Sequence, residues 1–357
     1  MRHHPASPAT TCILLALLAA ASPSPAPPAG RGRGGNPAAA AAGQRLERSA
    51  PVMDGVLRIA AAARGGPPDT VQVSGALDLA FAEAARLADV LAPGGGAGEL
   101  ARLNGGAGER RFECSPDLYV ALEAAVAMAG ATDGAYDPTC GPLLRAWEPR
   151  GGARAPEPAD LAAARLLTGW RMLTLDPDTR TARFTRPGME VVLDAVAHGY
   201  VLERAARQLR DRGVVRARLE LGGDVLAFTN HDAWSATIAD PADDARPALT
   251  LTVANAAVAS ARGDRTGDAR VVDPRTGQPP PAGAAVTVVA RSALGAHALA
   301  EALLVMGRES AASYARTHPD TGVLWLEAGT DGVRAWPWNL ARLTPEPGAR
   351  VEWMSEP

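Results

Sequence analysis

The sequence predicts an α+β protein. Its 357 residues are 47% hydrophobic, which is enough apolar material for one large domain or two fused lobes with a substantial core. Apolar residues recur at helical spacing in several long segments, whereas other, shorter segments are strand-like. These strand-like segments are too numerous for a simple alternation of strand, helix and strand, so we expect the helices and sheets to be arranged as in α+β folds.

Turn-forming residues separate the elements predicted in the first half of the chain. Residues 52–61 have the pattern of a short strand region, and residues 75–91 that of an amphipathic helix. A glycine-rich loop leads to a short helix at residues 99–104, which ends at Asn-Gly. Pro116 begins the next helix, whose apolar spacing lasts to Ala129 before a loop with Gly and Pro ends it.

The second half is predicted to be rich in strands. Strand-like pieces flank a turn at residues 176–178, and apolar residues continue on both sides of a Gly-Gly turn at residues 222–223. Two helices interrupt the strands, and Gly307 closes the second as a C-cap. The predicted strands are residues 191–193, 214–221, 225–228, 234–238 and 248–253, and the predicted helices are residues 199–212 and 295–306.

The N-terminus has the pattern of a secretory signal peptide, which we place at residues 1–26. A basic start is followed by an apolar stretch at residues 12–21 and then by serine and proline. That stretch is well short of the ~20 residues that a membrane-spanning helix needs, so we expect cleavage and not anchoring. The expected location is therefore periplasmic or extracytoplasmic, with association with the inner membrane left open.

Composition divides the rest of the chain into three parts. Residues 27–48 are rich in Pro, Gly, Ala and Arg without an apolar period, which predicts a disordered spacer. Residues 49–345 form the predicted domain, and residues 346–357 form a C-terminal tail. The formal net charge of -3 has no block of like charges behind it, which argues against a nucleic-acid partner.

Two cysteines remain once the signal peptide is removed. Cys114 and Cys140 would lie in an oxidising compartment, where a disulfide is permitted, but a chain of this size does not need one. The alternative is two small buried thiols that pack as hydrophobic residues. So few cysteines exclude a metal site built from cysteine alone.

Five segments carry glycines and polar residues of the kind that line nucleotide sites. Gly222, Gly223 and Gly277 allow the backbone to approach a ligand closely, and N–H groups beside them are suited to phosphate oxygens. Taken singly, each segment is equally compatible with an ordinary turn. The five are residues 99–104 (ELARLN), 134–139 (GAYDPT), 197–200 (AHGY) with 221–224 (LGGD), 272–277 (VDPRTG) and 298–307 (ALAEALLVMG).

Together these segments resemble the signature elements of the ApbE family, the secreted bacterial FAD:protein FMN transferases. The resemblance implies an ApbE-like, T-fold-related domain with two lobes, mixed or antiparallel sheets and flanking helices. It implies that FAD is cleaved between its phosphates, that FMN passes to a threonine of a client protein, and that AMP is released. The implied client carries a Thr-containing flavinylation motif and is a membrane redox protein, such as a subunit of an ion-pumping quinone reductase.

By the same resemblance, FAD binds in a cleft that these segments form. Arg275 has the planar fork that suits a pyrophosphate, although it could equally pair with Asp273 to brace the loop. Tyr136 could lie beside the flavin ring or simply belong to the core. The implied FAD-binding residues are Asn104, Tyr136, Asp137, Thr139, Gly222, Gly223, Asp224, Arg275, Thr276 and Gly277.

Several catalytic positions depart from the family pattern. The resemblance places the catalytic residues at Asp273, Arg270 and His198. Arg270 stands where the family has a histidine proposed as the base, and an always-protonated guanidinium cannot accept a proton. His198 stands where the family has a lysine. The chain is therefore either an active transferase or a non-catalytic homologue that binds a flavin or another nucleotide.

The metal site departs from the pattern as well. The resemblance implies Mg²⁺ held by an aspartate, a threonine and a backbone carbonyl, at positions that are here His297, Glu301 and Ala197. Magnesium prefers hard oxygen ligands, which Glu301 supplies and an imidazole does not. If His198 lies close to His297 and Glu301, the set favours zinc, iron or manganese. Otherwise the histidines are hydrogen-bonded pocket residues without a metal.

Overall fold

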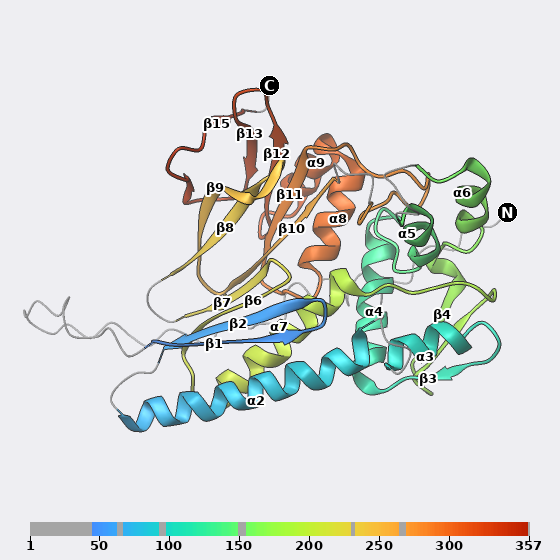
Figure 1. Cartoon of the computed structure of the whole chain (residues 1–357), viewed down its shortest axis with the longest axis horizontal. Helices are drawn as coiled ribbons and strands as arrows, with labels where there is room; N and C mark the ends of the chain where they lie inside the picture. The colour runs from blue at the N-terminus through green and yellow to red at the C-terminus, as the bar shows by residue number, and fades with distance from the viewer. Residues whose placement is uncertain are drawn as a thin grey trace, which may run out of the picture.

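The computed structural model of the chain describes residues 45–62, 67–92, 98–148, 155–229, 233–263 and 269–355. The predicted signal peptide and the spacer up to residue 44 lie outside the described residues. The chain folds into a larger lobe built on an extended sheet and a smaller lobe of short helices and strands (Figure 1). The α+β class and the two lobes are thus confirmed.

A nine-stranded sheet is the framework of the larger lobe. Its order is β1-β2-β6-β7-β10-β11-β12-β13-β15, and neighbouring strands are antiparallel except β13 and β15, which are parallel. The strands form because apolar residues alternate, as in β6, where every second residue is buried. The strands are β1 (Arg45–Val52), β2 (Gly55–Ala62), β6 (Arg216–Leu221), β7 (Asp224–Phe228), β10 (Ala256–Arg262), β11 (Ala284–Ala290), β12 (Gly322–Ala328), β13 (Val333–Trp338) and β15 (Val351–Trp353).

A second sheet covers part of one face of the first. It has three strands in the order β14-β9-β8, where β8 spans Trp234–Asp240, β9 Asp243–Val253 and β14 Leu343–Pro345. Ile238 and Leu251 of this sheet form one buried cluster with Leu324 of the main sheet. The two sheets therefore enclose an apolar layer of their own, away from the helices.

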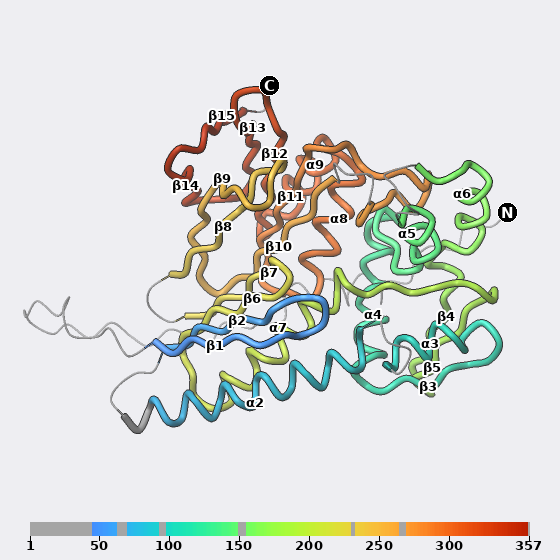
Figure 2. Tube along the Cα trace, in the orientation of Figure 1, coloured from blue at the N-terminus to red at the C-terminus, as the bar shows by residue number. Residues whose placement is uncertain are grey.

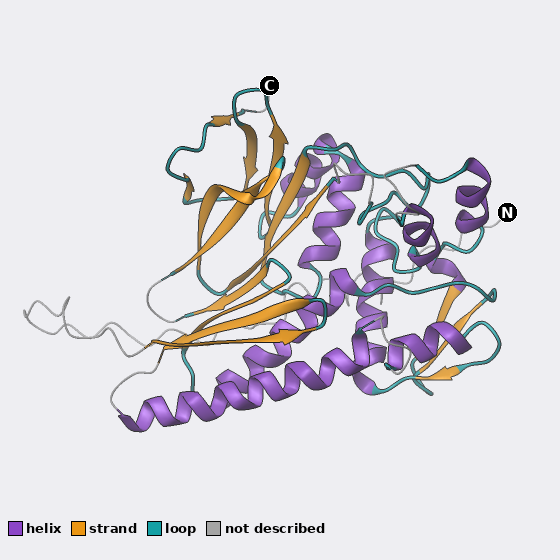
Figure 3. Ribbon diagram, viewed as in Figure 1, coloured by secondary structure: helices purple, strands orange, loops and turns teal. Residues whose placement is uncertain are grey.

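Helices cover the other face of the main sheet, as the ribbon in Figure 3 shows. They are α2 (Pro67–Leu91), α7 (Asp194–Asp211), α8 (Ala296–Met306) and α9 (Arg308–Thr317). α7 packs against α2, β6 and β7, and α8 packs against β10 and β11. A Cβ at Gly199 would lie 2.0 Å from the Ala293 carbonyl oxygen, so only glycine lets α7 pass this close to the start of α8.

The smaller lobe joins the larger one through α4 (Pro116–Ala131), whose N-terminus is capped by the Ser115 side chain. A three-stranded sheet of β3 (Phe112–Glu113), β5 (Thr181–Phe184) and β4 (Leu173–Asp176) lies at its far side. The trace in Figure 2 shows the long excursion of the chain through this lobe between β2 and β6. The other elements are α3 (Glu99–Gly106), α5 (Gly141–Trp147), α6 (Pro158–Arg165) and a 3-10 turn at Trp170–Met172.

Two predicted boundaries of the domain are wrong. Residues 45–48, predicted as spacer, belong to β1, because Arg45 to Arg48 pair with Ala62 to Ile59 in a hairpin. Residues 351–353, predicted as tail, form β15 and pair in parallel with β13. Both strands depend on partners elsewhere in the chain, which a local compositional argument does not see.

Residues 191–193, predicted as a strand, are irregular in the structure. The Asn104 side chain binds both the N–H and the carbonyl oxygen of Val191, at 2.9 Å each, so a side chain replaces the ladder partner that a strand would need. The helix predicted at residues 199–212 begins earlier, at Asp194, and therefore includes His198.

Cys114 and Cys140 are both free thiols, of which Cys114 is buried and Cys140 half-buried. Within the described ranges, no helix is both long enough and apolar enough to cross a membrane.

Candidate functional site

The candidate site lies where two hairpin turns meet the first turns of α7 and α8. The turn between β1 and β2 adjoins the turn between β6 and β7, since a Cβ at Gly55 would lie 3.4 Å from the Gly222 nitrogen. Gly222 and Gly223 have φ angles of 60° and 90°, which favour glycine. A Cβ at Gly222 would lie 2.5 Å from Cε1 of His198, so the missing side chain makes room for this imidazole.

His198 is buried in this corner, and only 5% of its surface is exposed. Its Nε2 lies 3.0 Å from Oδ1 of Asp54, which stands in the β1–β2 turn. Its Nδ1 is buried and has no hydrogen-bond partner among the residues that the structure describes. Burial alone would raise the pKa of Asp54, but the hydrogen bond and charge of His198 lower it.

The second histidine of the site, His297, lies between two carboxylates. Its Nδ1 is 3.0 Å from each oxygen of Asp224, and its Nε2 is 3.7 Å from Oε1 of Glu301. Burial would lower the pKa of His297, but Asp224 and Glu301 raise it to about 9. Burial raises the pKa of Glu301 to about 7, against the lowering effect of His297. The structure thus favours an imidazolium between carboxylates.

One cluster contains both histidines. Ligand atoms of His198, Asp224 and His297 lie within 4.8 Å of one another. The sequence left open whether His198 lies close to His297, and the structure brings ligand atoms of the two together. It assigns the carboxylate of the set to Glu301, whereas the structure brings Asp224 closest, and Glu301 lies next to His297. Ala197, the third predicted metal residue, is fully buried in α7 next to His198.

A small cavity of about 60 Å³ adjoins this cluster. Tyr136 lies on its wall, fully enclosed, and its hydroxyl has no hydrogen-bond partner within the described part of the chain. Arg270 is exposed and also lines the cavity. The cavity is far smaller than the roughly 300 Å³ or more of ordinary ligand pockets, so a flavin nucleotide would need side chains at its mouth to move. Its lining includes Tyr136, Asp137, Cys140, Asp194, Arg270 and Glu301.

Asp137 and Thr139 form a hydrogen-bond network within the wall of the cavity. Asp137 Oδ1 accepts hydrogen bonds from the Thr139 N–H and hydroxyl at 2.8 and 2.6 Å, and Oδ2 accepts the Trp170 N–H at 2.7 Å. The Thr139 hydroxyl oxygen in turn accepts the Gly169 N–H at 2.7 Å. Burial raises the pKa of Asp137, against these hydrogen bonds, which lower it. The two residues predicted to bind FAD thus shape the wall through internal bonds.

The loop at residues 273–278 is also braced internally. Asp273 Oδ1 accepts the N–H and the Nε–H of Arg275 at 2.9 and 2.8 Å, which is the alternative that the sequence left open. The Gly277 N–H binds the Asp273 carbonyl at 2.7 Å, and the Trp147 indole donates to the Gly277 carbonyl at 2.8 Å. Thr276 is exposed at the tip. The Asp273 carboxylate, predicted to be catalytic, is therefore paired with Arg275.

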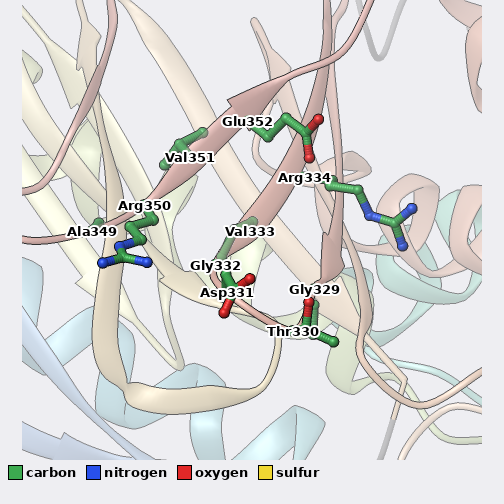
Figure 4. Close-up of a pocket in the computed structure, with 11 residues that line it drawn as sticks. Gly329, Thr330, Asp331, Gly332, Val333, Arg334, Ala349, Arg350, Val351 and Glu352 are labelled. Carbon is green, nitrogen blue, oxygen red and sulfur yellow. The ribbon is translucent and has the colours of Figure 1, made fainter.

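A much larger cavity lies elsewhere, at the β13–β15 edge of the main sheet. It measures about 820 Å³, and none of the predicted site residues lines it. Figure 4 shows that its walls carry charged side chains of both signs, among them Asp331, Arg334 and Arg350, spread around an open groove. Size alone therefore does not locate the functional site.

Sequence reasoning missed two acidic neighbours of the histidines. Asp54 precedes a glycine in a hairpin turn, and nothing local indicates that it reaches His198. Asp194 is half-buried and interacts electrostatically with His198, Asp54 and His297. The sequence could have indicated Asp194, because it places a carboxylate where the resembled family has glycine. Burial raises the pKa of Asp194, which the two histidines lower.

Comparisons with known proteins show the family of this chain. Residues 53–325 match the model of the ApbE family, so the chain belongs to the ApbE family. A curated relative from Vibrio cholerae, named FAD:protein FMN transferase, is 28% identical over 253 residues, covering 67% of this chain and 75% of the relative. One of the same name from Klebsiella pneumoniae is 26% identical over 270 residues, covering 73% and 84%.

The fold agrees with solved structures as well. The flavin transferase ApbE from Vibrio cholerae superimposes with a TM-score of 0.71 at 25% sequence identity, and the match covers 83% of this chain and 97% of the solved one. The family assignment and its α+β architecture are therefore confirmed together, from the sequence and from the shape.

Proposed function

We propose that this chain is an FAD:protein FMN transferase, which moves FMN from FAD to a threonine of a client protein. The observation that carries the proposal is the convergence of the family's segments on one place. Tyr136, Asp137, Arg270 and Glu301 line one cavity although they lie far apart in the chain. Curated relatives with the same fold bear that activity in their names.

The reaction balances without an external oxidant or reductant. The threonine oxygen bonds to the phosphorus of the FMN half of FAD, the bond from that phosphorus to the bridging oxygen breaks, and AMP leaves. The hydroxyl proton goes to solvent or to a base. Arg270 stays protonated, so its part is to hold the negative pyrophosphate at the mouth of the cavity. When no metal ion is bound, the His297 imidazolium adds a second positive charge nearby.

Magnesium, which the family resemblance implies, does not fit the residues present. Two imidazoles, His198 and His297, occupy the corner where hard oxygen ligands would be needed. A second candidate function, flavin binding without transfer, is favoured by the loss of the family's proposed base at Arg270.

Export and the client belong to the same proposal. The signal-like N-terminus supports an exported protein, and a client that is a membrane redox subunit with a Thr-containing motif would be met in that compartment. FAD is then the donor, and no nucleic acid takes part.

The deciding experiment incubates the purified full chain with FAD and a client peptide that carries the acceptor threonine, with zinc, manganese or magnesium in separate reactions. We expect a fluorescent peptide whose mass has grown by that of FMN less water, and an equal amount of AMP. The matched control is the same peptide with valine in place of the threonine. Binding of FAD without either product would establish the second candidate instead.

A further inference from the structure

The contact between His198 and Asp54 has the form of a metal-binding imidazole with its supporting carboxylate. A ligating histidine commonly gives the N–H of one ring nitrogen to a carboxylate and presents the lone pair of the other. Here Nε2 is 3.0 Å from Asp54 Oδ1, and Nδ1 is buried without a partner among the described residues. When Nε2 carries the proton, Nδ1 is unprotonated, and its lone pair is available to bind a metal ion inside the protein.

Two further residues with ligand atoms lie close to His198. Ligand atoms of His198, Asp224 and His297 are within 4.8 Å of one another. Atoms around one tetrahedral zinc lie roughly 3.3–3.5 Å apart, as bond lengths near 2.0–2.1 Å require. The ligand atoms would therefore have to move closer together by up to about 1.5 Å, through rotation of their side chains. Glu301, whose Oε1 is 3.7 Å from His297 Nε2, supplies a fourth nearby donor.

The charge of the surroundings also fits a cation. Asp224 is buried and Asp194 and Glu301 are half-buried beside the two imidazoles, whereas Asp54 is exposed, and no arginine is among the groups that perturb Asp194. Carboxylates therefore outnumber imidazoles in this corner. Buried charges of one sign are costly unless they are paired or coordinate a metal.

We propose that His198, Asp224 and His297 bind one divalent ion of the zinc class, in preference to magnesium. Imidazole nitrogens suit zinc and its neighbours in the first transition series, whereas magnesium takes near-octahedral oxygen ligands. A corner that is merely a closed network of ion pairs would leave no buried ring nitrogen without a partner. The site does not depend on flavin transfer, and it differs in ligand set and metal from what the family resemblance implies.

The test measures metal binding by the full chain, purified on a tag without histidine. Zinc chloride is titrated against a chromogenic chelator, with magnesium chloride in excess as competitor. We expect one zinc per chain, bound at least about tenfold more weakly after His198→Gln or His297→Gln, since each removes a ligand. Asp54→Asn, which removes the support of His198, should weaken binding about 10–100-fold.

The matched control is His318→Gln. His318 follows α9 and stacks on Tyr314 with ring centroids 4.0 Å apart, and it should not affect zinc. Zinc that stays bound in both cluster variants, for example on His3 or His4, would overturn the proposal, and so would displacement by an equal concentration of magnesium.

A measurement on the unchanged chain guards against variants that fail to fold. Cobalt chloride alone should give the intense visible absorption of tetrahedral Co²⁺ with nitrogen and oxygen ligands. A spectrum no stronger than that of free cobalt overturns the site. Zinc binding without FMN transfer would support the metal site and contradict the proposed function. Transfer with magnesium in a chain that retains no zinc does the reverse.

Discussion

At the scale of single residues, glycines and carboxylates decide what the histidines can do. Gly222 has no side chain where His198 needs room, and Asp54 fixes which nitrogen of His198 is free. Asp224 and Glu301 favour the charged form of the other imidazole, His297, as long as no metal ion is bound. The corner is thus set by contacts that each involve one or two atoms, and a single methyl group is enough to disturb it.

Gly222→Ala tests this. The substitution adds a Cβ 2.5 Å from His198 Cε1, in a backbone with φ of 60° that L-residues seldom adopt. Gly223→Ala is the matched control, because its φ of 90° is at least as unfavourable for an L-residue but nothing lies within 4 Å of the added Cβ. We expect Gly222→Ala to lower the free energy of unfolding by about 1 kcal/mol more than the control, measured by urea denaturation. Equal losses would show that the imidazole adapts freely.

How far the site could be predicted differs from residue to residue. The meeting of His198 with His297 could be predicted because both stand at recognisable places in family segments. Asp54 could not, since a hairpin turn carries no local mark of the side chain that it will meet. The roles of Asp137, Thr139 and Asp273 were also out of reach, because an acidic residue in a loop binds its own backbone as readily as a ligand.

At the scale of elements, a charged network ties three helices together beneath the site. Asp117 of α4 accepts hydrogen bonds from the Tyr200 hydroxyl and from Arg204 Nη1 of α7, at 2.6 Å each. Arg86 of α2 lies 2.8 Å from its other oxygen, and Arg204 also binds Glu83 of α2. This network sets the position of α7, and hence of His198, against the rest of the chain.

The network predicts a loss of stability in acid. Burial would raise the pKa of Asp117, but Tyr200 and Arg86 lower it, and the pKa of Glu83 is lowered chiefly by the Arg86 hydrogen bond. Groups with a lowered folded-state pKa stabilise the protein above their unfolded value of about 4 and lose this effect as the pH falls through the folded value.

Asp117→Asn removes part of this dependence. We expect its free energy of unfolding to be lower than that of the unchanged chain at pH 6 and to fall less steeply between pH 5 and pH 3. Thermal unfolding at a series of pH values measures both. The exposed Asp78→Asn, which breaks only a surface contact with Arg48, is the control. Parallel curves for Asp117→Asn and the unchanged chain would contradict the role assigned to the network.

At the scale of the whole molecule, the sheet ends in a strand from the last residues of the chain. β15 pairs in parallel with β13, and the Met354 N–H donates to the Ala335 carbonyl at 2.9 Å. Local sequence could not predict this, since a three-residue strand has too few apolar positions to show a period. The long helices, by contrast, could be predicted from their hydrophobic period, and the hairpins from their turn residues.

Removal of residues 351–357 should therefore destabilise the protein although no site residue is lost. The deletion leaves the hydrogen-bonding groups of β13 unpaired at an open sheet edge. We expect a midpoint of thermal unfolding lower by a few degrees, about 2–4 °C for each kcal/mol lost in a protein of this size or slightly smaller, and faster aggregation by light scattering. A matched chain with Val351→Pro, which removes one backbone donor, should show a smaller change. If the shortened chain unfolds at the same temperature as the full-length chain, residues 351–357 are a loose tail and not part of the sheet.

The excursion between β2 and β6 has a consequence for how the chain is made. Arg58 and Glu220 are neighbours across the sheet, yet the whole smaller lobe is synthesised between them. One side of the β1–β2 hairpin stays unpaired until β6 docks on β2, and the corner that holds Asp54 against His198 cannot close earlier. Pairing between such distant segments carries the loop-closure entropy that slows folding, so the histidine corner is among the last places to become native.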